Sequence, residues 1–300
     1  MRAINHIIII LSASLILAAC GGDKKNAPTD TLGSGSIDIS VDETYRPIIE
    51  EQLKVFDSSF PEAHIKATYK AESECIKDFM DGKARLILVT RGLLTDEKQV
   101  LEQKKVVSTS LPIAKDGIAI IVNNTVSDTL TLSQVKGILT GKYNEKKTVV
   151  FDNQGSSTLR YILDSLIPGE KLGQDVFAAK TSDSVIAYVM NNPNAVGFIG
   201  VSHVSDFSDP EGLAFIKNVK VVAVMNDKDQ QYYKPYQAYI AQQLYPLTRD
   251  LYYINRETYP GLGTGFANFL SKERGQLIFK QARLFPLRSN IIIREATVNP

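Results

Sequence analysis

Short apolar runs alternate with stretches of helical spacing along most of this 300-residue chain. The run Leu86-Ile87-Leu88-Val89 is typical of a buried strand, whereas 44–56 has the pattern of a helix. We expect strands at 37–41, 63–69, 85–90, 117–123, 196–201, 220–224 and 248–255, and helices at 44–56, 72–80, 95–104, 132–139, 182–190, 266–270 and 273–282. Because strands and helices take turns, the pattern predicts an α/β fold with a mainly parallel sheet.

The segment 149–166 is the clearest candidate for a ligand site. Its β-like run ends in a small polar turn, and a helix begins at Ser156, Ser157 and Thr158. Hydroxyls and unpaired backbone N–H groups in a first helical turn attract an oxyanion such as phosphate or sulfate. The same residue types are also ordinary helix N-caps, so both interpretations stay open. In an open α/β sheet the ligand binds beyond the carboxyl ends of strands, which is where this turn lies.

An apolar run near the N-terminus has the length of a secretory signal and is too short for a membrane span. It covers 7–19, follows Arg2 and ends in Leu17-Ala18-Ala19-Cys20. This ending resembles a bacterial lipobox, which implies cleavage before Cys20 and a lipid on its thiol. We therefore expect a signal peptide at 1–19, lipidation of Cys20 and a flexible polar tether at 20–36.

The charge balance and the thiol count exclude several functions. The chain has 34 Lys and Arg against 33 Asp and Glu, and loss of Arg2 with the signal peptide makes it formally neutral. The absence of a basic stripe argues against a nucleic-acid partner. Once Cys20 is lipidated, Cys75 has no partner for a disulfide, and the small number of His residues argues against a Cys/His metal site. No cofactor is expected.

Six segments together resemble the PstS-like phosphate ABC-transporter substrate-binding proteins. They are I-D-I-S-V-D-E-T-Y-R-P-I, Y-K-A-E-S-E-C-I, L-I-L-V-T-R-G-L-L-T-D-E, L-P-I-A-K-D-G-I-A-I-I-V-N, G-S-S-T-L-R-Y and A-V-G-F-I-G, in this order. The resemblance covers nearly the whole mature chain. It implies a periplasmic binding protein type II fold, in which two α/β lobes joined by two hinge strands close on an oxyanion. The implied boundaries are 37–115 and 256–300 for lobe one and 116–255 for lobe two, with hinge strands at 117–123 and 248–255.

The resemblance also implies which residues face the ligand. Thr44 matches a Thr in the first loop whose hydroxyl and N–H bind the anion, and Ser73 lies where the second helix start offers a Ser. Ser156 and Thr158 match the outer residues of the family's S-G-T motif, while Ser157 replaces its Gly. These five residues are the first candidates for the ligand site.

One departure from the family pattern affects the charge of the site. Where the family often has an Arg four residues before S-G-T, this chain has Asp152. We expect the missing cation to come from Arg91, in the loop after the third strand, or from Arg160, one helical turn beyond Ser156.

Asp42, Glu43 and Glu74 add negative charge near the expected mouth of the site. One interpretation is that a carboxylate accepts the proton of hydrogenphosphate and so selects it over sulfate. The other is that acidic residues favour the first turns of helices. If all three face the cleft, a cationic or zwitterionic ligand is a further alternative.

The sequence thus predicts a lipid-anchored extracytoplasmic protein that captures inorganic phosphate for an ABC-transporter permease and is not an enzyme. It would face the periplasm or the cell exterior from a bacterial membrane. One alternative, consistent with Asp152, is a relative that lost its ligand and acts as a surface or signalling lipoprotein. Another is a secreted serine hydrolase with Ser156 or Ser157 as nucleophile and His203 as base. The hydrolase is disfavoured because G-S-S-T lacks the spacing of a nucleophile elbow.

Overall fold

A computed structural model describes residues 29–204 and 218–289 of the chain. The expected signal peptide and Cys20 lie outside these residues, so the lipid anchor stays a prediction. Within the two described ranges, no helix has the length and apolar character that a bilayer crossing requires.

Ten strands in the described part of the chain form one curved sheet. It consists of two blocks of parallel strands, one at each end, and a central antiparallel pair. Its order is β2-β1-β3-β12-β4-β8-β6-β7, and β9 and β13 also pair with β4. The strands of this sheet are β1 Gly35–Asp42, β2 Ala63–Lys70, β3 Leu86–Val89, β4 Thr109–Asn123, β6 Thr148–Phe151, β7 Val176–Ala178, β8 Ala195–Gly200, β9 Val219–Val221, β12 Thr248–Asn255 and β13 Phe285–Pro286. A small second sheet contains β5 Thr129–Leu130, β10 Ala223–Met225 and β11 Tyr232–Tyr233.

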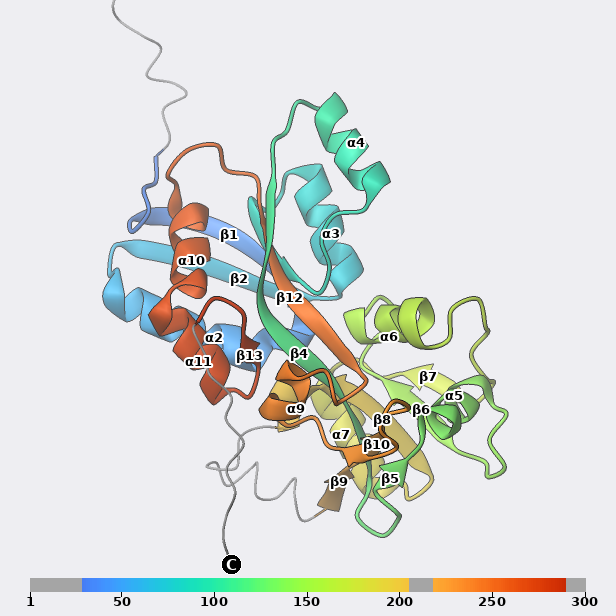
Figure 1. Cartoon of the computed structure of the whole chain (residues 1–300). Helices are drawn as coiled ribbons and strands as arrows, with labels where there is room; N and C mark the ends of the chain where they lie inside the picture. Colours follow the sequence, from blue (N-terminus) through green and yellow to red (C-terminus); the bar gives the residue numbers. More distant parts are fainter. Residues whose placement is uncertain (1–28, 205–217, 290–300) are drawn as a thin grey trace, which may run out of the picture.

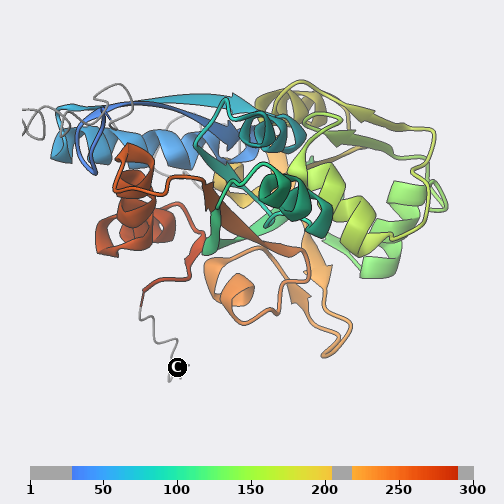
Figure 2. The ribbon, with the colours of Figure 1, turned by 90° about the horizontal axis from the view of Figure 1, so that it is seen from above.

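Helices cover the two ends of the large sheet. They are α2 Arg46–Ser59, α3 Glu72–Asp81, α4 Thr95–Gln103, α5 Leu132–Thr140, α6 Ser157–Tyr161, α7 Ser182–Asn191, α9 Gln237–Ala241, α10 Leu262–Ser271 and α11 Glu273–Gln281, with the short helical turns η3 Glu43–Tyr45, η4 Ile162–Leu166 and η5 Val201–Val204. Lobe one contains β1 to β3 with α2, α3, α10 and α11, and lobe two contains β6 to β8 with α5, α6 and α7 (Figure 1). Seen from above, the two lobes lie side by side (Figure 2).

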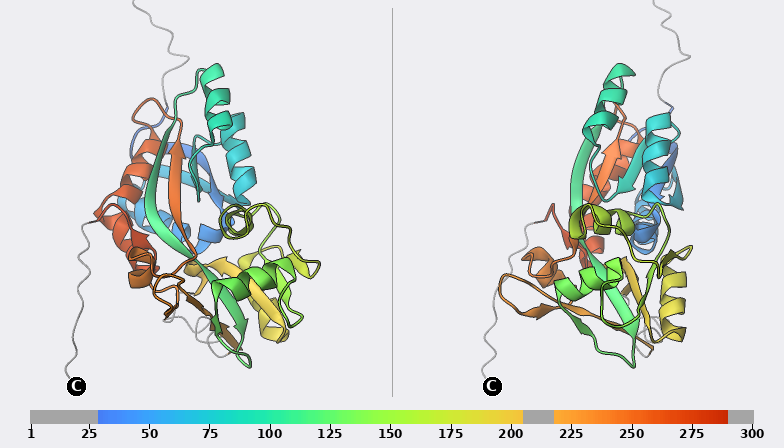
Figure 3. Two further views of the ribbon diagram at one scale, coloured as in Figure 1. Left: turned by 45° about the vertical axis from the view of Figure 1, so that its right-hand side comes forward. Right: turned by 90° about the vertical axis from the view of Figure 1, so that its right-hand side faces the viewer.

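The strands β4 and β12 connect the two lobes (Figure 3). β12 pairs with β3 of lobe one through 252–255, and β4 pairs with β8 of lobe two through 118–122. The predicted fold class, two α/β lobes joined by two hinge strands, is therefore confirmed.

The expectation of a mainly parallel sheet is wrong at its centre. β4 and β12 are antiparallel to each other, β12 is antiparallel to β3, and β4 is antiparallel to β8. β4 is 15 residues long because it carries the chain out of lobe one and on into lobe two. β12 brings the chain back beside it, and two adjacent strands that leave and return must be antiparallel.

Residues with special backbone properties set the ends of several helices. The Thr131 hydroxyl accepts a hydrogen bond from the Gln134 backbone N–H, while the Gln134 side chain accepts one from the Thr131 N–H, so α5 starts with a capping box. α5 ends at Gly141 with φ of 72°, and α3 ends at Gly82 with φ of 78°. Both positions are in the left-handed region that glycine adopts without strain.

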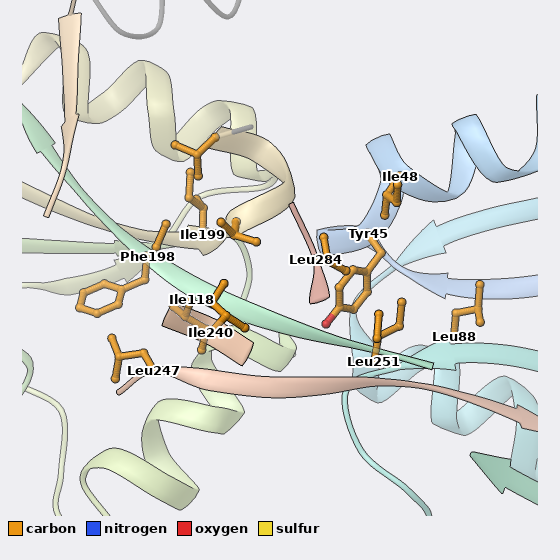
Figure 4. Packing of buried hydrophobic residues seen from close by; sticks show 14 of the residues in the cluster. Tyr45, Ile48, Leu88, Ile118, Phe198, Ile199, Ile240, Leu247, Leu251 and Leu284 are labelled. Atoms are coloured by element: carbon orange, nitrogen blue, oxygen red, sulfur yellow. The ribbon is translucent and has the colours of Figure 1, made fainter. Parts of the chain in front are cut away.

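One apolar core extends through both lobes and around the hinge (Figure 4). In lobe two it includes Phe198, which packs near Ile118 of β4. In lobe one it includes Leu88 and the fully buried Tyr45, near Leu251 of β12. The hinge strands are thus packed on both sides, which fixes the position of the polar residues that they carry.

The first described residues are packed against lobe one instead of forming a tether. Asp30 is 6% exposed, and its carboxylate accepts hydrogen bonds from Arg85 Nη2 and from the Leu262 backbone N–H, both at 2.8 Å. β1 then begins at Gly35. The tether expected at 20–36 is therefore corrected for residues 30–36, where the polar composition predicted a flexible segment but Asp30 forms a buried ion pair.

Candidate functional site

Polar residues from both lobes and from the hinge meet at the carboxyl ends of strands. Thr44 lies in the turn after β1, in lobe one, and Ser157 and Thr158 lie at the start of α6, after β6 in lobe two. The hinge strand β12 contributes Arg249. All four side chains are buried. This is the position at which open α/β sheets bind their ligands.

Two hydroxyls accept hydrogen bonds from one end of the Arg249 guanidinium, and a third hydroxyl lies beside them. Its Nη1 donates to Ser157 Oγ at 2.9 Å and to Thr158 Oγ1 at 3.3 Å, and Ser157 Oγ lies 3.5 Å from Thr44 Oγ1. We call these four residues the hydroxyl–guanidinium cluster. Within the described residues, Arg249 Nη2 is buried and has no hydrogen-bond partner. A buried charged donor of this kind is costly to leave unpaired, and a bound anion would provide the acceptor.

The other hinge strand holds Arg249 in place. Asp116 is the register partner of Arg249 in the β4–β12 pair, and its Oδ2 accepts from Arg249 Nε at 3.0 Å. The Tyr45 hydroxyl donates to the same oxygen at 3.2 Å. Because both members of the ion pair are buried, its geometry fixes the plane of the guanidinium.

A second ion pair joins the lobes beside this cluster. Arg160 of α6 donates from Nε to Glu72 Oε2 at 2.5 Å and from Nη2 to Thr90 Oγ1 at 2.7 Å. Glu72 Oε1 in turn accepts from the Thr90 N–H at 2.8 Å and from its hydroxyl at 2.7 Å. Burial alone would raise the pKa of Glu72, but Arg160 and Thr90 outweigh it and the pKa is lowered. Glu72 is therefore an ionised partner that ties lobe one to lobe two.

The lobes also touch at the exposed rim of the site. The Ser73 backbone N–H donates to the Gly155 carbonyl at 3.4 Å, and a Cβ atom on Gly155 would lie 2.4 Å from Ser73 Oγ. A groove of about 490 Å³ opens beside this contact, and Ser73, Glu74 and Gly155 are among the residues that line it. The groove marks where solvent reaches the contact between the lobes.

Several carboxyl groups near the cluster have raised pKa values. Burial, followed by the charge of Glu72, raises the pKa of Asp42 to about 7. Burial, followed by the charge of Asp152, raises the pKa of Glu43 to about 7. Burial also raises the pKa of Asp152 itself. The site therefore contains acids whose charge depends on pH in the neutral range.

The structure brings together only some of the residues predicted from the sequence. Thr44, Ser157 and Thr158 meet in the cluster. The Ser156 hydroxyl accepts from the Leu159 N–H at 3.1 Å, so it is the N-cap of α6 as well as a neighbour of the cluster. Ser73 lies at the exposed rim.

The predicted charged residues have other partners. Arg91 binds Glu97 within lobe one through two hydrogen bonds of 2.7 Å, and Arg160 binds Glu72. Glu74 is exposed at the rim, whereas Glu43 is buried with Oε2 3.5 Å from the Ser182 hydroxyl. Both guanidinium groups pair with carboxylates of lobe one here, and Arg249 is the guanidinium that contacts Ser157 and Thr158. The expected role of Arg91 or Arg160 as the missing cation therefore stays a prediction.

Arg249 is the residue of the cluster that sequence reasoning missed. Its segment was interpreted only as a hinge strand. Strand alternation places Arg249 on the same face as Leu251 and Tyr253, and all three are buried. A charged residue on the buried face of a strand was the available signal.

The Ser157 hydroxyl lies beside a cation. Ser157 accepts a hydrogen bond from the Arg249 guanidinium. A guanidinium group is always protonated, so it can stabilise an anion but cannot remove the proton of the serine hydroxyl. Burial lowers the pKa of His203 to about 4. No group of three or more His, Cys, Asp or Glu side chains that could hold a metal ion occurs within 29–204 and 218–289.

A two-lobed α/β fold with buried polar groups between the lobes defines a solute-binding protein of the periplasmic binding protein class. Residues 26–273 match the model of the PBP superfamily domain, and the chain belongs to this family. The resemblance to phosphate ABC-transporter binding proteins that the sequence predicted is confirmed by the following relatives.

The curated relatives include proteins from two staphylococcal species that carry the name phosphate-binding protein PstS. The protein from Staphylococcus epidermidis is 26% identical over 264 residues, which cover 81% of this chain and 75% of the relative. The protein from Staphylococcus aureus is 25% identical over 285 residues, which cover 89% of this chain and 83% of the relative.

Solved structures show the same similarity. A Clostridium perfringens protein described as a phosphate ABC transporter substrate-binding protein with bound phosphate superposes with a TM-score of 0.70 at 25% identity, covering 84% of this chain and 100% of its own. An ABC-type phosphate transport receptor from Vibrio cholerae shares the fold with a TM-score of 0.62 at 21% identity, covering 84% of this chain and 100% of its own.

Proposed function

We propose that this protein captures inorganic phosphate between its two lobes and presents it to an ABC-transporter permease. The observation that carries the proposal is the hydroxyl–guanidinium cluster, in which Ser157 of lobe two accepts from the buried Arg249 and lies 3.5 Å from the Thr44 hydroxyl of lobe one. Hydroxyl and guanidinium donors of this kind match the oxygens of a tetrahedral anion. The names of the relatives support phosphate as the anion.

The proposed ligand site retains the residues expected from the sequence and adds the hinge arginine. Thr44, Ser156, Ser157, Thr158 and Arg249 would bind the anion directly. Ser73, Glu43, Glu74 and Arg160 would shape the rim and the closed arrangement of the lobes, and Arg91 would support lobe one. Closure would select the bound state because ligand contacts come from both lobes.

We further propose that the protein acts outside the cytoplasm, attached to a bacterial membrane by lipid on Cys20. The apolar 7–19 run and the Leu17-Ala18-Ala19-Cys20 ending support this proposal. The lobe boundaries proposed at 115/116 and 255/256 are supported by the position of β4 and β12 between the two parts of the sheet.

Calorimetry on the mature chain tests the proposal. Phosphate should release or absorb heat with one-site saturation, whereas sulfate and an amino-acid mixture should not. Thr44→Val removes one cluster hydroxyl at nearly constant volume and should weaken phosphate binding about tenfold. Thr129→Val, at an exposed position of β5 in a strand that tolerates Val, is the matched control.

The outcomes separate the alternatives. Absence of a phosphate signal in the wild-type protein would favour the relative that lost its ligand. Heat with a cationic or zwitterionic solute, but not with phosphate, would assign the site to a different ligand class.

A further inference from the structure

Three guanidinium groups in this region pair with carboxylates of the protein. Three ion pairs account for them: Arg249 with Asp116 at 3.0 Å, Arg160 with Glu72 at 2.5 Å, and Arg46 with Glu43 at 3.9 Å. Asp42 and Asp152 have no such partner among the ion pairs of the described chain. If both were ionised, an incoming anion would meet two uncompensated carboxylates at a buried site.

Each of these two carboxyl groups has one oxygen without a hydrogen bond in the described structure. Asp42 Oδ1 accepts from the Thr44 N–H at 3.1 Å, and Asp152 Oδ1 accepts from the Asn153 N–H at 3.0 Å. Both Oδ2 atoms are buried and have no partner. Both residues are 1% exposed, so solvent does not compensate these oxygens.

Titratable and polar groups of several elements lie close to Asp42, among them Tyr45 of η3 and Cys75 of α3. Glu72 of α3 and Asp152 of the β6–α6 turn are acidic, Arg249 of β12 is basic, and Ser157 of α6 offers its hydroxyl. Asp42 thus lies near two members of the cluster, Arg249 and Ser157, and its Oδ2 is free to form a further hydrogen bond.

From this geometry we propose that Asp42 binds the anion as a neutral carboxylic acid, so that phosphate binding takes up a proton from solution. The proposal rests on the proposed function and adds its protonation chemistry. A neutral carboxyl group has an O–H donor, so Asp42 Oδ2 would donate to a phosphate oxygen while Oδ1 continues to accept from Thr44. Asp152 would contribute a second, weaker linkage of the same kind.

The titration behaviour agrees with the geometry. Burial, followed by the charge of Glu72, raises the pKa of Asp42 to about 7, against the opposing influence of Arg249 and Ser157. A bound anion would raise this pKa further, because it adds negative charge beside the carboxyl group. At a pH above that value, binding must therefore protonate a carboxylate that is ionised in the free protein. Each proton taken up makes the affinity fall up to about tenfold per pH unit.

The opposite arrangement makes a different prediction for one substitution. If ionised Asp42 instead accepted a proton carried by hydrogenphosphate, Asp42→Asn would remove an acceptor and weaken binding at every pH. If Asp42 donates, the Asn amide N–H replaces the carboxyl O–H, and the Asn carbonyl still accepts from Thr44. The variant then avoids the cost of protonation.

The test is calorimetric titration of wild-type protein and Asp42→Asn with inorganic phosphate at about pH 6 and about pH 8.5. Each titration is repeated in buffers of different ionisation enthalpy, because the change in observed heat gives the number of protons exchanged. Because phosphate itself titrates near neutral pH, the result is the difference between the two proteins. We expect wild-type protein to take up about one proton more than Asp42→Asn at the higher pH, and the variant to bind on the order of tenfold more tightly there. Near pH 6 the two affinities should agree within a few-fold.

Asp38→Asn is the matched control, since Asp38 is an exposed residue of the same strand β1. It should behave as wild-type protein at both pH values, and thermal unfolding should show that both variants fold. Equal proton uptake in wild-type protein and Asp42→Asn, or weaker binding by Asp42→Asn at the higher pH, overturns the inference and leaves the phosphate function standing. Failure of the wild-type protein to bind phosphate at either pH overturns the proposed function instead.

Discussion

Arg160 of lobe two and Glu72 of lobe one form an ion pair at 2.5 Å in which the carboxylate side chain is 2% exposed. Arg160 also donates to Thr90, which donates to Glu72 in turn, so the three side chains form a closed triangle across the lobes. All these contacts are between protein atoms. These contacts therefore stabilise the observed arrangement of the two lobes independently of any ligand.

Arg160→Gln should shift the protein toward an open arrangement. The substitution leaves the buried Glu72 carboxylate without its cation, which we expect to weaken closure by about 1 to 2 kcal/mol. Small-angle X-ray scattering without phosphate should give a larger radius of gyration than for wild-type protein. Lys142→Gln breaks an exposed ion pair with Glu170 inside lobe two and should leave the radius unchanged. Equal radii for Arg160→Gln and wild-type protein would show that the triangle does not hold the lobes.

Arg249, and not Arg91, should provide the charge that binds phosphate. Arg249→Lys keeps a cation beside Asp116 but loses the planar donors that reach Ser157 and Thr158, so we expect at least a tenfold loss of phosphate affinity. Arg91→Lys disturbs a pair with Glu97 and should change the affinity less than threefold. Calorimetry on both variants checks this, and a larger loss for Arg91→Lys would return that residue to the ligand site.

Asp30 should make the stability of lobe one dependent on acid pH. Burial alone would raise its pKa, but hydrogen bonds from Arg85, Leu262 and Tyr259 hold the pKa at about 2, below the ordinary value of 3.8. A carboxyl group with a lowered folded pKa stabilises the protein above the unfolded pKa and loses this effect as pH falls toward the folded pKa. Asp30→Asn should therefore reduce the free energy of unfolding by about 2 kcal/mol at neutral pH.

The difference between Asp30→Asn and wild-type protein should shrink as pH falls from about 4 to about 2, which denaturant titration at several pH values would measure. Asp38→Asn, at an exposed position, is the control. A constant difference across this range would mean that the new amide side chain disturbs packing and that the ion pair contributes little.

Cys20→Ala should abolish attachment to the membrane without affecting phosphate binding. The proposed lipid is attached to the Cys20 thiol, which alanine lacks, and every residue of the proposed ligand site lies beyond position 41 in the sequence. Fractionation of cells that express each form should place wild-type protein with membranes and the variant elsewhere. Membrane association of both forms to the same extent would exclude this anchor.

The fold was largely predictable because its signals are local. Buried runs such as 86–89 and glycine C-caps such as Gly82 and Gly141 mark strands and helix ends directly. The antiparallel hinge could not be read in this way, since it depends on β12 returning beside β4 after the chain has completed lobe two. The two-residue strands β5 and β11 are too short for a periodic pattern, and the strand expected at 220–224 is divided between β9 and β10.

The ligand site was predictable in its hydroxyls and not in its charges. Thr44, Ser157 and Thr158 lie at the ends of recognisable strands, so topology alone brings them close. The partner of a long charged side chain depends on tertiary contacts, which is why Arg91 was expected in the site and Arg249 was not. Ion pairing therefore needed the structure, whereas the positions of the short polar residues did not.

Gly155 determines how closely the two lobes can approach. Its Cα faces the Ser73 side chain and the Ala71 Cβ atom so directly that an added methyl group would lie 2.4 Å from the first and 3.2 Å from the second. The Ser73 hydroxyl could rotate away, but Ala71 could not. A side chain at this position would therefore hold the two lobes apart. It would speed ligand dissociation while leaving the fold of each lobe unchanged.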